Sequence, residues 1–309
     1  MYSEELINSI FLYAHKADYE VKIVSSTHLN ELEDELEYRK KTDGFNEEFY
    51  SERLTSFKFS PPGAFTKYES IIIFAVPQPT VLLTFRFQGE DRSVYIPPTY
   101  DISIDTVIER DLKEILTSKG FNIERVVLPL KLLAVRCGLA EYGRNNICYI
   151  PGKGSFYRFI AFYSNLSCPD ETWRSVCLME RCKNCRACIS ACPTGAIDES
   201  RFLLHAELCI SFHNEHAGSF PDFIDPSFHQ YLFGCLKCQN VCPENRLKSI
   251  WIKEKEHFSE FETSFILNNE LLNEMPLSMR QKLERLNIID DYPYLSRNLW
   301  YCINNHQNT

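Results

Sequence analysis

Thirteen cysteines stand in this chain of 309 residues, and eight of them fall between positions 182 and 242. The first group, CKNCRACISACP at 182–193, has the spacing C-x2-C-x2-C-x3-C-P. In this spacing three thiolates on one loop reach three irons of a 4Fe-4S cubane, while the fourth ligates the other cluster of a pair. The segment therefore predicts a site for two iron-sulfur clusters.

The second group, CLKCQNVCP at 235–243, has one cysteine fewer than the full run. Cys209, 26 residues before Cys235, is the natural replacement, which brings the number of candidate thiol ligands to eight. The crossover of the fourth cysteine then assigns the ligands of each cluster. Cluster 1 is predicted to be held by Cys182, Cys185, Cys188 and Cys242, and cluster 2 by Cys192, Cys209, Cys235 and Cys238.

A zinc site is the main alternative interpretation of these cysteines. Two C-x2-C pairs could close one tetrahedral site, but four thiols suffice for that. Zinc would leave the third cysteine of each run and both Cys-Pro steps without a role. The spacing therefore favours iron-sulfur chemistry over zinc or disulfides.

The other five cysteines and the N-terminus bear on the compartment. Cys137, Cys148, Cys168, Cys177 and Cys302 are scattered, as ordinary thiols are. The chain begins MYSEELINSI, without a basic n-region or a small-residue cleavage site. The apolar run at 71–76 is far shorter than the ~20 residues of a membrane span. We expect a cytoplasmic protein, where clustered thiols bind metal, and no membrane partner.

The composition indicates a globular protein, with 44% hydrophobic residues and 13% aromatics. The formal net charge of −9 argues against a nucleic-acid platform that works through a bulk positive field. A local basic patch remains compatible with this charge.

Hydrophobic patterning predicts alternating helices and strands over the first 165 residues. This alternation implies an α/β or α+β layer domain. The charged run at 31–41 is expected to be a solvated helix face. The patterns predict helices at 3–17, 28–41 and 104–118, strands at 19–25, 70–76, 81–87, 123–128 and 156–164, and C-terminal helical stretches at 271–275, 279–286 and 294–303.

A glycine-rich connection, CGLAEYGRNNICYIPGKGS, occupies residues 137–155. Glycines in quick succession permit irregular backbone that approaches a ligand closely. They are equally typical of two surface turns between strands. The sequence alone leaves both interpretations open.

The order of these parts resembles the epoxyqueuosine reductase family, corrinoid-dependent enzymes that finish queuosine in tRNA, and more distantly the reductive dehalogenases. The resemblance covers roughly residues 65–305 and is carried most specifically by CPTGAI after the first cysteine run, CISF at 209–212 and GCLKCQNVCPEN at 234–245. The tail SRNLWYCI at 296–303 is similar to the family's C-terminal helices. Where the family has G-W-x-G-K-N, this chain has AEYGRN at 140–145.

The resemblance implies an α+β fold: a mixed α/β nitroreductase-like N-terminal domain, then a bacterial two-cluster ferredoxin-like domain and short C-terminal helices. We place these three domains at 1–170, 171–250 and 251–309. It also implies a cobalamin beside the clusters. The residues expected to line the corrin are Gly138, Tyr142, Gly143, Arg144, Asn145, Gly154 and Ser155.

The resemblance also implies a proton donor. The family's aspartate, 14 residues before the glycine that matches Gly138, corresponds to Glu124. A carboxyl can donate a proton if partial burial raises its pKa, but Glu124 is also readable as a solvated strand carboxylate next to Arg125. Tyr142 beside Arg144 is the other candidate acid, although a loop tyrosine more often packs.

Two functions follow. The first is an epoxyqueuosine reductase-like oxidoreductase, in which two 4Fe-4S clusters pass electrons to a corrinoid for a reductive deoxygenation or elimination. Its expected partners are a low-potential donor such as ferredoxin or flavodoxin, and a tRNA or a small molecule as substrate. A tRNA would depend on a local patch around residues such as Arg144, Lys153 and Arg158. The alternative is a ferredoxin-like electron-transfer protein without a corrinoid that reduces a partner protein.

Overall fold

The computed structural model describes residues 2–60, 68–100, 102–168, 170, 172–246 and 251–305. They form two compact units, each built from non-contiguous segments. The first comprises Met1–Pro77, Ser103–Arg186 and Asp198–Leu204, and the second comprises Gln78–Ile102, Ala187–Ile197 and His205–Thr309. The sequence predicts three consecutive domains instead, and that division stays a prediction. Among the described residues, none of the helices has the length and apolar character needed to cross a membrane.

The first unit is built on a four-stranded sheet in the order β1-β2-β8-β5, in which every neighbouring pair is antiparallel. A separate two-stranded hairpin, β6-β7, lies within the glycine-rich connection at 137–155. Together with the helices these strands confirm the predicted mixed α/β architecture. The strands are β1 (Glu20–Ser25), β2 (Ser70–Pro77), β5 (Ile123–Arg125), β6 (Glu141–Tyr142), β7 (Cys148–Tyr149) and β8 (Tyr157–Ser164).

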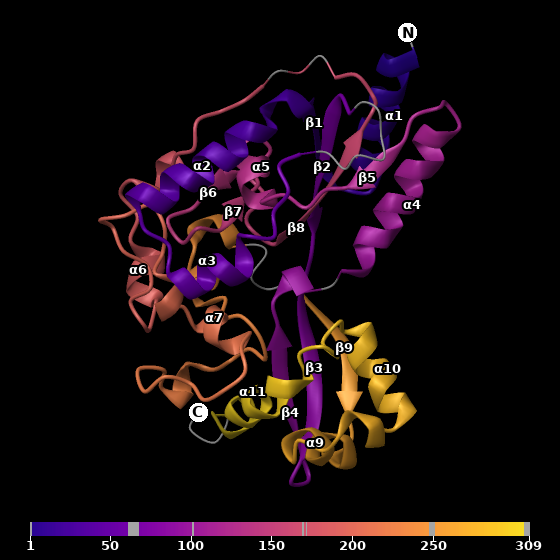
Figure 1. Ribbon diagram of the computed structural model, residues 1–309. Coiled ribbons are helices and arrows are strands. Elements are labelled where there is room, and N and C mark those ends of the chain that lie inside the picture. The colour runs from indigo at the N-terminus through magenta and orange to yellow at the C-terminus, as the bar shows by residue number, and fades with distance from the viewer. Residues whose placement is uncertain are drawn as a thin grey trace. The chain divides into compact units, whose positions relative to one another are not determined.

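Helices cover both faces of this sheet, as Figure 1 shows for α1 and α4 on one side and α2 and α5 on the other. Ile71 and Ile73 of β2 pack with the α2 and α5 side, while Ile72 and Phe74 pack with the α1 and α4 side. Burial on both faces explains why 70–76 reads as a continuous apolar run. The helices are α1 (Tyr2–Lys16), α2 (Leu29–Thr42), α3 (Glu47–Arg53), α4 (Ser103–Thr117) and α5 (Leu130–Arg136), with 3-10 turns at Ser26–His28 and Glu180–Cys182.

The second unit has a three-stranded sheet in the order β4-β3-β9, in which β3 and β4 form an antiparallel hairpin and β9 pairs parallel with β3. Residues of α9, α10 and α11 share one apolar core with the sheet. The strands are β3 (Thr80–Phe87), β4 (Glu90–Ile96) and β9 (Ile252–Phe258). The helices are α6 (Ala187–Ala191), α7 (Ile210–Asn214), α8 (Lys237–Asn240), α9 (Glu260–Leu267), α10 (Leu277–Arg285) and α11 (Tyr292–Asn305), and 3-10 turns lie at Pro98–Tyr100, Ala206–Leu208, Pro226–Phe228, Pro243–Asn245 and Leu272–Glu274.

The segment 251–309, predicted as helical, begins instead with the strand β9. Its sequence, IKEKEHF, is mostly charged and exposed, and only Phe258 at its end is fully buried. Pairing with β3 therefore decides its structure, because the segment carries almost no apolar signal of its own.

Phe258 gives a test of this core. Its ring stacks on that of Phe85 with centroids 4.5 Å apart, and both side chains are fully buried. Phe258→Ala should lower the free energy of unfolding by about 3–5 kcal/mol, because it removes a buried ring and leaves a cavity. Urea unfolding followed by circular dichroism measures this. Phe261→Ala on α9 is the control, since Phe261 is 63% exposed and its loss should change stability little.

His229 gives a pH-dependent test in the same unit. It is buried, with its ring centroid 4.4 Å from that of Phe220 and 4.9 Å from that of Tyr301. Burial first, and then the positive charges of Arg297 and Lys237, lower the pKa of His229 from 6.5 to about 4. The unfolded chain therefore binds this proton first, and the stability that the neutral ring contributes is lost as the pH falls from about 6.5 to about 4.

Between pH 7.5 and pH 5.5 this titration should lower the free energy of unfolding of wild type by about 1.4 kcal/mol. The same contribution should be absent in His229→Gln. Anaerobic urea titrations at pH 7.5 and 5.5 check this. Equal losses in the two proteins would contradict it.

Candidate iron-sulfur site

All eight predicted cluster ligands are reduced cysteines that form no disulfide. Cys182 is buried and the other seven are partly exposed. Eight thiol sulfurs suit two cubanes of four ligands each, so the chemistry of the donor set fits the predicted clusters. Within the described residues, no three cysteine, histidine or carboxylate side chains already converge on one metal position.

The four ligands predicted for cluster 2 all belong to the second unit. Burial first, with a smaller contribution from the nearby Cys209 and Cys192, raises the pKa of Cys235 to about 12. Burial also raises the pKa of Cys209, to which Cys192 contributes in the same direction. The three thiols thus lie close enough to disfavour one another's thiolates. A bound metal reverses this, because coordination deprotonates a thiol outright.

Two short helices of the second unit, α6 and α8, each contain one of the predicted ligands. Helix α6 contains Cys188 and lies beside α8, which contains Cys238. Leu236, between Cys235 and Cys238, has the left-handed backbone angle φ of 51° and starts α8. This conformation folds the C-x2-C segment into the tight turn that two ligands of one cluster need.

The ligands predicted for cluster 1 are divided between the units. Cys182 and Cys185 belong to the first unit, whereas Cys188 and Cys242 belong to the second. The assignment of this ligand set stays a prediction from the spacing.

The glycines of the connection at 137–155 have local structural reasons. Gly138, with φ of 75°, ends α5, and the N–H groups of Gly138 and Leu139 bond to carbonyls of its last turn. A Cβ on Gly143 would come within 2.6 Å of both Asn145 and Tyr149. Gly154, with φ of 86°, lies in the turn after β7. The two-turn interpretation therefore accounts for these three glycines without a ligand.

The buried side chain of Asn145 is also engaged within this connection. Asn145 is buried, donates from Nδ2 to Oη of Tyr149 over 3.0 Å and accepts from the N–H of Ile147. Ser155 is buried as well. These contacts close the turn on itself.

Arg144 links this turn to the first cysteine group. Its Nη2 donates to the backbone oxygen of Cys182 over 3.0 Å, and its buried Nε has no partner among the described residues. The backbone oxygen of Tyr142 accepts from the N–H of Met179 over 2.8 Å, three residues before Cys182. The turn therefore holds the segment that leads into the first ligand, with a guanidinium beside it.

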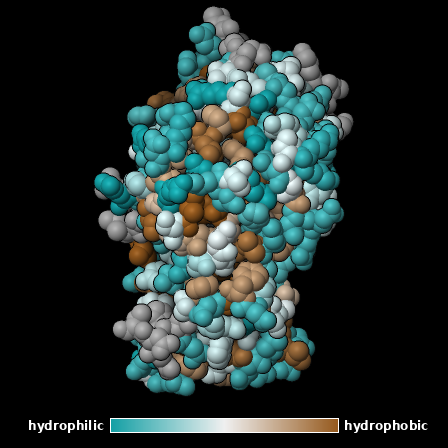
Figure 2. All heavy atoms as spheres, turned by 90° about the vertical axis from the view of Figure 1, so that its left-hand side faces the viewer, coloured by the Kyte–Doolittle hydropathy of each residue, from teal (hydrophilic) through white to brown (hydrophobic). Residues whose placement is uncertain are grey.

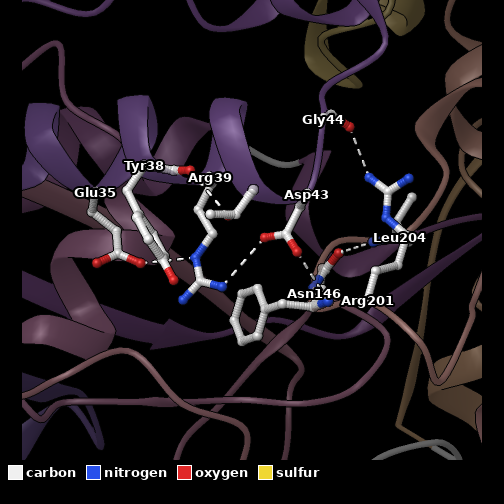
Figure 3. A network of polar contacts seen from close by, with 10 residues as sticks. Glu35, Tyr38, Arg39, Asp43, Gly44, Asn146, Arg201 and Leu204 are labelled. Atoms are coloured by element: carbon white, nitrogen blue, oxygen red, sulfur yellow. Dashed lines mark hydrogen bonds and ion pairs between the residues drawn. The ribbon is translucent and has the colours of Figure 1, made fainter.

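A network of polar contacts holds the segment 198–204, which follows the first cysteine group, to the same turn and to the end of α2 (Figure 3). Asn146 donates from Nδ2 to the carbonyl of Phe202 over 2.8 Å and accepts from the N–H of Leu204. Arg39 bonds to Glu35 and Asp43, and its guanidinium carbon lies 4.1 Å from the centroid of the Phe202 ring.

No pattern in the sequence predicts this role of Arg39 and Asp43. Both lie in or just after the charged run at 31–41, which was expected to be a solvated helix face, yet Glu35 and Arg39 are only 15% exposed in their side chains. That expectation is wrong at these positions. A charged stretch that pairs with its own helix offers no sequence signal for a further contact to residues 198–204, more than 150 positions away.

The two candidate proton donors lie on different elements. Glu124 is on β5, where Oε2 accepts a hydrogen bond of 2.7 Å from the hydroxyl of Tyr68. Tyr142 is on β6, its ring 5.6 Å from that of Phe202 in an edge-on arrangement. Burial raises the pKa of the Tyr142 phenol well above its ordinary value. Neither residue's role as an acid is tested by these contacts, and both stay predictions.

Two members of the predicted basic patch are paired with carboxylates. Lys153 lies 2.6 Å from Glu20 and 3.4 Å from Asp18, and Arg158 forms two contacts of 2.6 and 2.7 Å with Asp105. A phosphate would have to compete with these acids. Of the three residues that the sequence suggested, Arg144 forms no ion pair with a carboxylate of the described residues and bonds instead to the backbone oxygen of Cys182.

Figure 2 views the molecule from the side on which α2 lies and shows apolar side chains gathered on the upper part of that face, framed by hydrophilic ones. Such a framed apolar area is more often a contact surface than a scattered set of surface residues is.

Comparison with known proteins bears directly on the cysteine region. Residues 181–245 match the family model described as a 4Fe-4S double cluster binding domain. The class of the protein is thereby defined: this is an iron-sulfur protein with a double 4Fe-4S domain and a mixed α/β fold.

The particular resemblance predicted from the motifs is also confirmed. The chain is similar to the curated epoxyqueuosine reductase of Staphylococcus aureus (strain NCTC 8325 / PS 47), with 30% identity over 215 residues, 66% of this chain and 54% of the relative. It spans about half the length of such curated relatives.

Solved structures show the same fold. The structure of epoxyqueuosine reductase from Bacillus subtilis matches with a TM-score of 0.71 and 21% identity, covering 99% of this chain and 83% of that chain. A crystal structure of epoxyqueuosine reductase with a tRNA-Tyr epoxyqueuosine-modified tRNA stem loop matches with a TM-score of 0.69 and 19% identity, covering 99% and 83%.

Arg144 gives a test of the charge beside cluster 1. A reduced cluster carries one more negative charge, so a nearby cation should favour reduction. Arg144→Gln should lower the reduction potential of one cluster by roughly 60 mV, about a tenfold change in a one-electron equilibrium. An anaerobic titration followed by electron paramagnetic resonance measures it.

Lys183→Gln is the matched control, because Lys183 is next to Cys182 but exposed and paired with Glu180. Solvent screens its charge, so the shift should be much smaller. Equal shifts in the two variants would contradict a special role for Arg144.

Proposed function

We propose that this chain is an epoxyqueuosine reductase-like oxidoreductase that passes electrons through two 4Fe-4S clusters for a reductive deoxygenation. The observation that carries the proposal is the double 4Fe-4S match at 181–245 within a chain whose fold follows that of epoxyqueuosine reductases over nearly its full length. The nitroreductase-like description of the α/β domain and the ferredoxin-like description of the cysteine region belong to this proposal.

The reaction class fixes what the protein must supply. Conversion of an epoxide to an alkene takes up two electrons and two protons and releases water. The clusters provide one-electron steps, and we propose a low-potential ferredoxin or flavodoxin as the donor that reduces them. The two protons must come from side chains or from water, and Glu124 and Tyr142 are the proposed acids. Glu124 is the preferred one, because burial opposes ionisation of the Tyr142 phenol.

A corrinoid is proposed on the resemblance alone. When bound, such a group supplies a cobalt centre that exchanges electrons with the substrate. The described contacts around Gly138, Gly143 and Asn145 are satisfied within the chain, and the buried Nε of Arg144 is the polar atom there that remains for a ligand. No step in the present proposal is therefore routed through the corrinoid.

The proposed substrate is an epoxide-bearing nucleoside, as in epoxyqueuosine, within a tRNA. A related fold was crystallised with an epoxyqueuosine-modified tRNA stem loop. The chain's formal charge of −9 and the ion pairs of Lys153 and Arg158 mean that phosphate contacts would be few and local. Binding is thus expected to depend less steeply on salt than that of a basic tRNA-binding protein.

A ferredoxin-like electron-transfer protein is the second candidate. The observation in its favour is that the glycine-rich connection closes on itself without a ligand. In that case the clusters would be reduced normally in protein free of cobalamin, and a partner protein would accept the electrons.

Iron analysis after anaerobic purification first tests the two clusters that both candidates require. Wild type should hold about eight irons per chain, and Cys238→Ser should lose about half of this iron, because one ligand of cluster 2 is missing. Cys177→Ser is the control, since Cys177 is exposed and outside the predicted ligand sets.

The same protein, incubated with cobalamin and passed through gel filtration, should retain the corrin, and its gene should restore queuosine in the tRNA of a strain that lacks epoxyqueuosine reduction. Full iron without corrin and without restoration would favour the electron-transfer protein. Wild type that contains no iron-sulfur cluster would overturn both.

A further inference from the structure

Helix α11 reaches the cysteine region from far along the chain, through Asn298. This residue lies 1% exposed in the second unit. Its Nδ2 donates to two backbone oxygens, that of Asn214 over 2.7 Å and that of Leu232 over 2.9 Å. One amide group therefore joins the segment after Cys209 to the segment before Cys235.

Asn214 strengthens the same connection. It ends α7, which begins directly after Cys209, and it is also 1% exposed. Its Nδ2 donates to the carbonyl of Gly234 over 2.7 Å. Gly234 precedes Cys235 and has a φ of 63°, and a Cβ there would meet the ring of Pro97 at 2.7 Å. The backbone next to Cys235 is thus held from two sides.

Arg297 fixes which way the Asn298 amide points. Its Nε and Nη2 donate to Oδ1 of Asn298 over 3.0 and 2.9 Å, so the amide nitrogen must face the two carbonyls. Nη2 also donates to the carbonyl of His213 over 2.9 Å, and Nη1 to that of Gly218. The guanidinium carbon lies 3.9 Å from the centroid of the Phe220 ring. Each of these contacts restrains the loop that follows Cys209.

Cys209 and Cys235 lie in the two segments that this network joins. The carbonyls held by Asn298 and Asn214 lie five positions after Cys209 and within three positions before Cys235. These hydrogen bonds therefore restrain the backbone close to each of the two cysteines.

We propose that Asn298, oriented by Arg297, is a positioning residue for the second cluster, because it sets the distance between the Cys209 and Cys235 loops. The inference rests on the proposed ligand set of Cys192, Cys209, Cys235 and Cys238. It extends the cluster site beyond the matched region 181–245 to the C-terminal helix. Replacing a residue that orients a metal ligand typically changes the metal affinity by about 10- to 100-fold.

The test is Asn298→Asp in the full chain, purified anaerobically. An aspartate keeps the size of the side chain and can still accept from Arg297, but it cannot donate to the two carbonyls. The second cluster should be lost to an iron chelator about 10- to 100-fold faster than in wild type, while the first cluster is lost at the wild-type rate. The spectrum of Cys238→Ser, which keeps only the first cluster, identifies which signal disappears.

Asn304→Ala is the matched control on the same helix, because among the described residues Asn304 Nδ2 bonds only to the carbonyl of Trp300 one turn earlier. It should keep both clusters at wild-type rates. Arg297→Lys, which retains the charge but not the forked contact with Asn298, should give an intermediate rate and covers the case in which Asn298→Asp does not fold.

Equal chelation rates for Asn298→Asp and wild type would overturn the proposal, as would loss of both clusters in parallel, which indicates general destabilisation. Wild type without any cluster would overturn the proposed function together with this inference, and its iron content separates that outcome from the others.

Discussion

Hydrogen bonds from a few side chains to backbone groups hold the cysteine segments in place. These segments contain only short helices and 3-10 turns, such as α6 and α8, so they have few regular backbone hydrogen bonds of their own. Arg144 binds the carbonyl of Cys182, Asn146 binds Phe202 and Leu204, and Asn298 joins the Asn214 and Leu232 carbonyls. A buried amide can serve two backbone groups at once, which makes asparagine effective in this role.

Charge acts locally in this protein. The formal net charge is −9, yet the arginines that bear on the cysteine region, Arg144 and Arg297, bond to backbone carbonyls rather than to carboxylates. Their positive charge is therefore not cancelled by an acid in those contacts. Lys153 and Arg158, by contrast, form ion pairs with carboxylates of the first unit. The sum of charges would have suggested an acidic surface throughout and hidden this difference.

Much of the first unit could be predicted from patterning, because its strands and helices are long and strongly apolar on their buried faces. The predicted strand at 70–76 is β2, and the predicted helix at 104–118 is α4. The strand β9 and the helices α3 and α9 were not predicted. Strand β9 is charged and exposed over most of its length, and α9 owes its start to the capping box of Ser259 and Glu262 rather than to a periodic apolar stripe.

By itself the sequence determined the chemistry: seven thiols in two runs and Cys209 between them, whose spacing along the chain specifies two 4Fe-4S clusters, as the double-cluster match of 181–245 confirms. That was possible because ligand spacing within a loop is a local property. Only the tertiary structure decided that the glycines of 137–155 close a turn of their own and that Arg39 and Asp43 hold the segment 198–204. It also decided that Asn298 joins the segment after Cys209 to the segment before Cys235. The contacts of Asp43 and Asn298 join residues from 66 to 159 positions apart, and no periodicity or spacing in a single sequence encodes which distant backbone group a buried side chain will meet.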